Sequence, residues 1–324
     1  MVEVIDSDID ACGFSLRTAY YLAYASKWAY AEADGWVQEL GLQRNIELFT
    51  CGQFHGFVGR LENVVVLAFR GTKNVKNCLT DAETPLVRHP PYPGRVHRGF
   101  AEAVEQVWPD VRRLLGTPSQ KLSVWITGHS LGGAMATLAS IRLASEGHAV
   151  RAVYTYGSPR VGNRLFRDAY PLVENYRFVN DNDLVPHLPF LWCYKHVGQL
   201  KLFDNEGNLQ EERHHWEAKK QALAGTAKRI QQAHLRANHA HHALGEFDWL
   251  ADHHLGGYLD AIKRILPRVP RRQRVDPPDV PACHVPTHWH RPESPLPKVP
   301  PPGSRRQDML SEADFIAAFC NQPR

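Results

Sequence analysis

The sequence lacks most of the features that mark specialised protein classes. Its six cysteines are widely spaced and form no Cys-x-x-Cys pair, so we expect mostly free thiols and no zinc ribbon. No apolar run reaches the roughly 18 residues that a membrane span needs, so we expect no transmembrane helix. Residues 1–30 lack the charged start, apolar run and cleavage site of a signal peptide. These absences favour the cytoplasm, although a chain that begins at the mature residue of a secreted protein would look the same.

Positive charge is too thinly spread to suggest nucleic-acid binding. The formal net charge is +4 with histidines neutral, and basic residues are interleaved with acidic ones except in the short run 270–274. Nucleic-acid-binding surfaces need a cluster or stripe of cations. We therefore expect no nucleic-acid partner, leave transient contact with a lipid surface open, and favour a monomer.

Strands and helices alternate along the first 266 residues. Apolar residues at helical spacing, and short apolar runs rich in β-branched residues, define these elements. Helices are expected at 16–33, 99–115 and 131–146, and strands within 45–70 and at 122–126, 151–156, 176–180 and 196–203. Such alternation predicts an α/β fold with a mainly parallel sheet covered on both faces.

The remaining residues break this alternation. Residues 209–250 are a long polar stretch that we interpret as an insert of one or two surface helices. About half of the 23 prolines lie in 267–306, which predicts an extended tail, and 307–324 could form a short terminal helix. Histidines gather at 214–242, but no carboxylate or cysteine completes a ligand set, so no metal site is expected. We thus predict one catalytic domain over residues 1–266.

The segment Gly128-His129-Ser130-Leu131-Gly132 follows an apolar strand and precedes a helix. It matches the G-x-S-x-G pattern, in which a serine stands on a strained turn between a strand and a helix. Side chains at the two glycines would collide with the neighbouring strand or helix. The pattern predicts that Ser130 is a nucleophile with an exposed hydroxyl.

A serine nucleophile needs a base and an acid that orients the base, and in this type of fold they follow the serine in the order acid, then histidine. Asp181 and Asp183 both come directly after the strand expected at 176–180. His253 and His254 both lie in a later segment that could supply the base. Spacing alone leaves both choices open.

At this point the chain resembles the class 3 lipases, a family of α/β-hydrolases that includes fungal triacylglycerol lipases. The resemblance covers about residues 16–266 and rests on ordered segments rather than on one motif. The matching segments are Phe69-Arg70-Gly71-Thr72, Val96-His97-Arg98-Gly99-Phe100, the Gly128-Gly133 turn, Tyr156-Gly157-Ser158-Pro159-Arg160-Val161-Gly162-Asn163, Asn182-Asp183-Leu184-Val185-Pro186-His187-Leu188-Pro189 and, more loosely, Tyr194-Lys195-His196-Val197-Gly198.

The resemblance implies specific roles. It selects Asp183 as the triad acid over Asp181, and it selects His253, followed five residues later by Tyr258, as the base, with His254 as the alternative. It further implies an oxyanion hole formed by Thr72 and the backbone N–H of Leu131. His129 and His196 match family positions, where they are expected to orient the backbone or to pack.

One departure concerns the lid. Family lipases often carry a lid helix with a tryptophan three residues before an aspartate, and here Cys78 precedes Asp81 in place of that tryptophan. We therefore expect the loop 73–98 or the insert 209–250 to cover the site instead.

The expected activity is serine-dependent hydrolysis of lipid esters of the acylglycerol type through an acyl-enzyme, without a cofactor. A short-chain esterase and a phospholipase A1 would share the same machinery. An acyltransferase, or a non-catalytic scaffold that recruits partners through its proline-rich tail, are the alternatives from other functional classes.

Overall fold

The sheet and its covering helices account for most of what the structure describes. The computed structural model describes residues 13–30, 46–61, 64–71, 85–119, 122–171, 173–180, 183, 185–189, 192–204, 206–210 and 253–266. All of them belong to the first of two compact units, Met1–Trp289. The predicted tail 267–306, the predicted helix 307–324 and most of the insert 209–250 lie outside these described residues.

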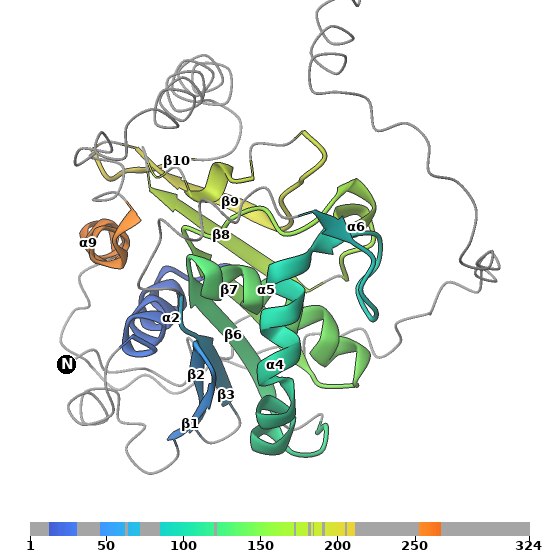
Figure 1. Cartoon of the computed structure of the whole chain (residues 1–324). Helices are drawn as coiled ribbons and strands as arrows, with labels where there is room; N and C mark the ends of the chain where they lie inside the picture. Colours follow the sequence, from blue (N-terminus) through green and yellow to red (C-terminus); the bar gives the residue numbers. More distant parts are fainter. Residues whose placement is uncertain are drawn as a thin grey trace, which may run out of the picture. The chain divides into compact units, whose positions relative to one another are not determined.

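Eight strands form one mixed sheet in the order β1-β2-β3-β6-β7-β8-β9-β10 (Figure 1). The strands are β1 (Ile46–Cys51), β2 (Phe54–Leu61), β3 (Val64–Phe69), β6 (Ser123–His129), β7 (Val150–Tyr156), β8 (Glu174–Asn180), β9 (Gln199–Phe203) and β10 (Leu209–Gln210). The centre, from β3 through β9, is parallel, whereas β1, β2 and β10 pair with their neighbours in antiparallel fashion. The predicted α/β fold with a mainly parallel sheet is therefore confirmed.

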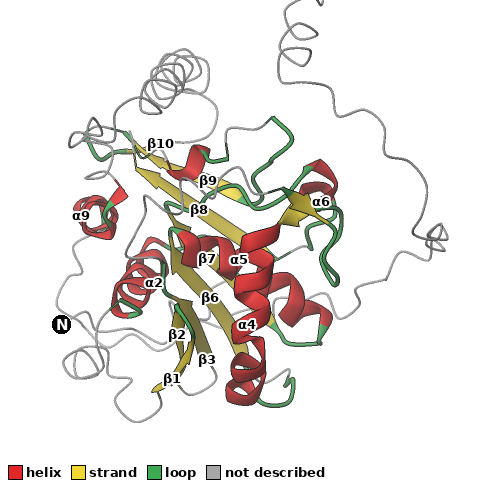
Figure 2. Ribbon diagram, viewed as in Figure 1, coloured by secondary structure: helices red, strands yellow, loops and turns green. Residues whose placement is uncertain are grey.

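Helices cover both faces of this sheet (Figure 2). Helices α4 (Arg98–Leu115) and α5 (Leu131–Ser145) pack on one face, and α2 (Leu16–Trp28) and α9 (Leu255–Ile265) pack on the other. Successive side chains of a strand point to opposite faces, so Val65 and Leu67 of β3 join the α4/α5 core while Val66 and Ala68 join the α2/α9 core. Burial on both sides explains why β3 is a continuous apolar run.

Several boundaries differ from those expected. Helix α2 ends at Trp28, with Ala29 as its C-cap, rather than at residue 33. Its N-cap is Ser15, whose hydroxyl accepts a hydrogen bond from Thr18 N. Strand β9 begins at Gln199, opposite Tyr176 of β8, rather than at residue 196.

Two short sheet segments were not expected. Within the predicted loop 73–98, β4 (Leu86–Val87) and β5 (Val96–His97) form a two-stranded antiparallel sheet. The insert expected from residue 209 begins with β10, which extends the main sheet. Two-residue strands carry too few residues to show a periodicity of two, which explains why the sequence did not reveal them.

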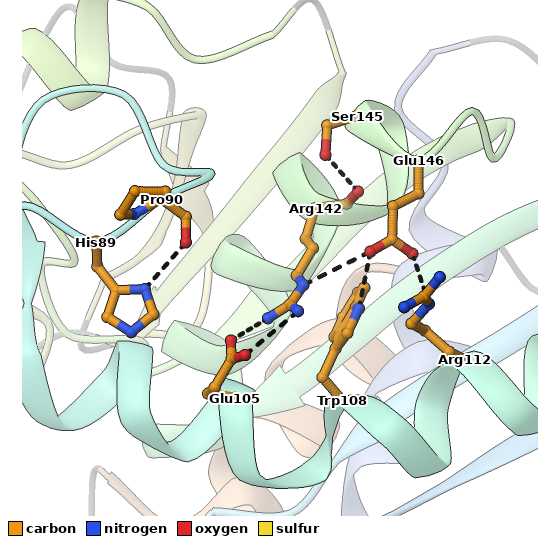
Figure 3. Close-up of polar contacts among 8 residues, drawn as sticks. All are labelled: His89, Pro90, Glu105, Trp108, Arg112, Arg142, Ser145 and Glu146. Carbon is orange, nitrogen blue, oxygen red and sulfur yellow. Dashed lines mark hydrogen bonds and ion pairs between the residues drawn. The ribbon is translucent and has the colours of Figure 1, made fainter.

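The contact between α4 and α5 combines ring stacking with ion pairs (Figure 3). The guanidinium of Arg142 on α5 lies 4.5 Å from the ring centroid of Trp108 and pairs with Glu105, both on α4. Trp108 Nε1 in turn donates to Glu146, 2.9 Å away, directly after α5. Most of the Arg142 side chain is shielded from water, so this cluster joins the two helices more strongly than exposed ion pairs would.

Two absences predicted from the sequence concern this part of the molecule. No helix among the described residues is both long enough and apolar enough to cross a bilayer. Cys51 and Cys193, the cysteines that the structure describes, are free thiols, as expected.

Candidate active site

Ser130 occupies the turn between β6 and α5, as the sequence pattern predicts. Its backbone has φ 58° and ψ −128°, and it is the one residue other than glycine with positive φ in the described part of the chain. The turn is held by hydrogen bonds of 2.9 Å from Ser130 N to Tyr156 O and from Gly133 N to Ser130 O. Strain of this kind costs about 1–3 kcal/mol and persists where surrounding contacts enforce it, which is typical of functional sites.

The two glycines of the pattern are required by close packing. A Cβ at Gly128 would collide with the backbone of Gly132, and a Cβ at Gly132 would collide with the carbonyl oxygen of Phe69 on β3. The start of α5 therefore lies directly against β6 and β3. The collision expected from the sequence is confirmed at both positions.

Asp183 and His253 form a buried hydrogen-bonded pair. His253 Nδ1 lies 2.8 Å from Oδ2 and 3.0 Å from Oδ1 of Asp183, and the two residues are 2% and 0% exposed. The carboxylate also accepts hydrogen bonds from Val185 N at 2.9 Å and from the Tyr258 hydroxyl at 2.6 Å. The Tyr258 oxygen accepts in turn from Asn180 N at 3.1 Å, so the acid is fixed to the end of β8.

This geometry bears on the alternatives that spacing left open. Asp183 contacts His253, whereas His254 is an exposed residue that forms the N-cap of α9. Asp181 lies outside the described residues. A carboxylate can only accept, so Nδ1 of His253 carries the proton and Nε2 presents a lone pair.

Two further contacts bring His253 close to Ser130. The residue before Ser130, His129, binds the His253 carbonyl oxygen through Nε2 at 2.7 Å. On the other side, a Cβ at Gly157 would lie 2.8 Å from Asp183 Oδ2 and 2.9 Å from His253 Cε1. Ser130 follows β6 and Asp183 follows β8, and His253 contacts Asp183 and His129, so the three residues lie near the carboxyl ends of these strands, where ligands bind in parallel sheets.

Two polar atoms of the candidate site are buried without partners. Both Ser130 Oγ and His253 Nε2 are inaccessible to water, and neither has a hydrogen-bond partner within the described part of the chain, so they make no hydrogen bond to each other. The expectation of an exposed Ser130 hydroxyl is therefore wrong, because Ser130 is 0% exposed. A buried polar atom without a partner costs about 1–3 kcal/mol. Ser130 Oγ and His253 Nε2 are therefore unsatisfied polar atoms, and both belong to residues for which the sequence predicts a catalytic role.

The expected oxyanion hole is described in part. Leu131 is the first residue of α5, so its N–H has no acceptor within the helix and lies at the positive end of the helix dipole. Thr72 lies outside the described residues. Gly71, directly before it, adjoins Ser130, because a Cβ there would lie 3.2 Å from Ser130 Cβ.

His129 has both ring nitrogens engaged. Its Nδ1 lies 2.9 Å from the Tyr30 hydroxyl, in addition to the Nε2 contact with His253 O. Burial lowers the pKa of His129 well below its ordinary value, and the neighbouring His253 ring adds to this shift. The expectation that His129 orients backbone agrees with this geometry, but Tyr30 was not singled out, because a tyrosine in a helical pattern carries no motif.

No metal centre emerges from the described ranges, in which no group of three or more histidine, cysteine or acidic side chains is placed to hold an ion. The histidines at 214–242 lie outside those ranges.

Part of this chain is similar in sequence to known lipases. A family model described as "Lipase (class 3)" matches residues 66–192. A lipase from Rhizomucor miehei is 35% identical over 154 residues, which are 44% of this chain and 42% of that protein. A secreted mono- and diacylglycerol lipase from Fusarium solani is 36% identical over 140 residues, which are 41% of this chain and 42% of that protein. The chain thus spans less than half the length of these curated relatives.

Solved structures show the same fold. Lipase II from Rhizopus niveus superposes with a TM-score of 0.52 at 26% identity, over 59% of this chain and 81% of that one. The α/β-hydrolase fold expected from the resemblance is therefore confirmed.

Proposed function

We propose that this chain is a serine-dependent carboxylic ester hydrolase acting on lipid esters of the acylglycerol type, because residues 66–192 match the family model described as "Lipase (class 3)". The names of its relatives from Rhizomucor miehei and Fusarium solani support the substrate class. The observation that carries the proposal is the buried Asp183–His253 pair beside the strained Ser130, with Oγ and Nε2 both unpartnered in the described part of the chain.

We propose that Ser130 and His253 perform the acyl transfer. As Ser130 Oγ attacks the ester carbonyl carbon, its proton passes to His253 Nε2. The C–O bond to the alcohol then breaks, and His253 returns the proton to the leaving oxygen. Water adds to the acyl-enzyme with the same histidine as base and releases the fatty acid.

Asp183 is proposed to orient His253 and to stabilise the imidazolium that forms on it. Its contacts with Val185 N and the Tyr258 hydroxyl support this role, because they hold the carboxylate in one place. A fixed acceptor keeps the proton on Nδ1 and the lone pair of Nε2 directed toward the nucleophile.

We propose that the oxyanion is bound by the N–H of Leu131 and by Thr72. The position of Leu131 at the start of α5 supports the first donor. The second rests on the resemblance and on the proximity of Gly71 to Ser130. Loss of one such donor would cost about 3–4 kcal/mol of barrier lowering.

The test is a series of nitrophenyl esters of increasing acyl length, assayed on the wild type and on Ser130→Ala. We expect turnover that is greatest for long acyl chains and that Ser130→Ala abolishes, whereas Ser145→Ala, which alters an exposed serine on α5, retains wild-type rates. An optimum at two to four carbons would make the chain a short-chain esterase. Equal rates for wild type and Ser130→Ala would refute the serine mechanism.

We propose residues 1–266 as the catalytic domain, followed by a tail over 267–306 and a terminal helix over 307–324. The proposed triad comes from a single chain, so a monomer suffices. Location in the cytoplasm stays a prediction, and secretion is the alternative that the name of the Fusarium relative favours.

A further inference from the structure

A chain of hydrogen bonds reaches the back of the candidate site from the far end of α2. It runs from the Tyr30 hydroxyl to His129 Nδ1 over 2.9 Å, and from His129 Nε2 to the His253 carbonyl oxygen over 2.7 Å. The rings of His129 and His253 also lie against each other, with centroids 4.6 Å apart and planes inclined by 34°. His129 is 5% exposed and His253 is 2% exposed, so water does not compete for these contacts.

Each hydrogen bond in this chain has one direction. A backbone carbonyl can only accept, so His129 Nε2 carries a proton and donates it to His253 O. Because burial keeps the imidazole neutral, Nδ1 has a lone pair and accepts from the Tyr30 hydroxyl. His129 therefore has no lone pair left for Ser130 and cannot replace His253 as the base.

Tyr30 is fixed by the segment that leads to the predicted oxyanion residue. The Arg70 guanidinium lies 5.7 Å from the centroid of the Tyr30 ring. Gly71 provides space for the hydroxyl, since a Cβ there would collide with Tyr30 OH and would lie 2.6 Å from His129 O. Within the segment Phe69-Arg70-Gly71-Thr72, Arg70 and Gly71 thus fix the position of Tyr30 in addition to leading to Thr72.

We propose that Tyr30 and His129 form a positioning pair that fixes the main chain of His253 and so aims its Nε2 at Ser130. This inference rests on the proposed ester-hydrolase function. His253 is then held at two points: Asp183 binds its ring nitrogen Nδ1, and His129 binds its backbone carbonyl oxygen. Without the second point, the ring can pivot about the Asp183 hydrogen bond, and Nε2 moves relative to Ser130 Oγ.

The expected effect falls on kcat rather than on KM. Neither residue needs to touch the ester, so substrate binding should persist, whereas misplacing a catalytic group by about 1 Å can reduce the rate about 100-fold. We expect His129→Phe, which retains an aromatic ring and removes both hydrogen bonds, to lower kcat about 10- to 100-fold with KM within about twofold. Tyr30→Phe should lower kcat by a smaller factor, because Nε2 can still donate.

The experiment measures kcat and KM on the full chain, normalised to the number of serines titrated by a phosphonate ester. The variants are His129→Phe, Tyr30→Phe, the double variant and His129→Gln, whose amide N–H can still reach the His253 carbonyl. The matched control is Tyr170→Phe, which removes a buried tyrosine hydroxyl that binds Ser140 and Asn175 and touches none of these residues. The control should retain wild-type kcat even if it loses as much stability.

Three results would support the pair: kcat of the double variant close to that of His129→Phe alone, substantial recovery of kcat in His129→Gln, and wild-type kcat in Tyr170→Phe. Non-additivity is expected because Tyr30 acts only through His129. Additive losses, no recovery in His129→Gln, or wild-type kcat in both single variants would overturn it. If His129→Phe does not fold, kcat of Tyr30→Phe is compared with kcat of Tyr170→Phe. A lower value in Tyr30→Phe supports the pair, and equal values overturn it.

Failure of this inference can be told from failure of the proposed function. If Ser130→Ala is inactive while His129→Phe has wild-type kcat, the hydrolase assignment stands and the positioning pair is wrong. If Ser130→Ala is as active as the wild type, the hydrolase assignment itself is wrong.

Discussion

Substituting alanine for Gly157 should disable the site without removing any of its functional groups. Gly157 follows β7 with φ +59°, and a Cβ there would lie 2.8 Å from Asp183 Oδ2, 2.9 Å from His253 Cε1 and 3.0 Å from His253 Nδ1. Real Cβ atoms do not approach other heavy atoms so closely. The added methyl group therefore has to push the carboxylate and the imidazole apart by several tenths of an ångström.

Two costs combine at this position. A non-glycine residue in the left-handed region costs about 1–2 kcal/mol, and forcing a methyl group into a packed site costs about 1–3 kcal/mol more. We expect a total destabilisation of about 2–5 kcal/mol. Because displacement by about 1 Å can cost a factor of about 100 in rate, kcat of the folded enzyme should fall about 10- to 100-fold.

Gly52→Ala separates the two costs. Gly52 has nearly the same φ, +58°, but a Cβ there would meet nothing within 4 Å. It should therefore lose stability through backbone strain alone and keep wild-type kcat. Urea unfolding and nitrophenyl ester turnover on both variants measure the two effects. If kcat of Gly157→Ala stays within about twofold of kcat of Gly52→Ala, Gly157 does not lie as close to Asp183 and His253 as the structure indicates.

Three other changes have defined outcomes. Arg142→Met removes the link between α4 and α5 (Figure 3) and should lower the free energy of unfolding by about 1–2 kcal/mol with kcat unchanged, whereas Arg164→Met, whose side chain is 77% exposed, should have no measurable effect on urea unfolding. Tyr258→Phe removes a donor to the buried carboxylate of Asp183 and should cost about 2–4 kcal/mol of stability and about tenfold in kcat; an unaltered kcat would contradict the role of this contact. Burial lowers the pKa of His129, so the unfolded chain binds a proton that the folded chain does not, and His129 should lower the free energy of unfolding by about 1.4 kcal/mol per pH unit below about pH 6.5. Urea unfolding between about pH 5 and 7 should show a pH dependence in the wild type that is steeper than that of His129→Phe by this amount.

The central sheet could be predicted because its strands are buried on both faces. The run 64–69 is apolar at every position, since alternate residues enter the α2/α9 core and the α4/α5 core. Residues 86–87 and 96–97 escaped notice because each segment is too short for a pattern and depends on the other for its hydrogen bonds. Strand direction was not predicted either: nothing in the composition of residues 46–61 indicates that β2 runs antiparallel to both β1 and β3.

The sequence predicted those residues of the candidate site that stand in a recognisable motif. Ser130 stands in a local pattern, and Asp183 and His253 were selected over their neighbours by resemblance rather than by spacing. Tyr30 and Gly157 were not identified as site residues, because their importance lies in contacts with residues distant in the sequence, His129 for Tyr30 and His253 for Gly157. Such contacts form only in the folded chain, so a single sequence does not reveal them.

The glycines of the matching segments point to one shared physical requirement. Gly71 follows β3, Gly128 and Gly132 flank Ser130, and Gly157 follows β7. At each of them a Cβ would collide with backbone or with a proposed catalytic side chain. Three neighbouring strands therefore deliver their ends to one small volume that cannot hold four extra methyl groups. The proposed acid, base and nucleophile and the N-terminus of α5 lie around that volume, while the strained Ser130 turn is stabilised by the two cores that hold the strands in register. The spacing of these motifs along the chain then follows from the sheet, since Gly71, Gly128 and Gly157 each lie at the carboxyl end of a strand and Gly132 lies in the first turn of the helix that follows β6.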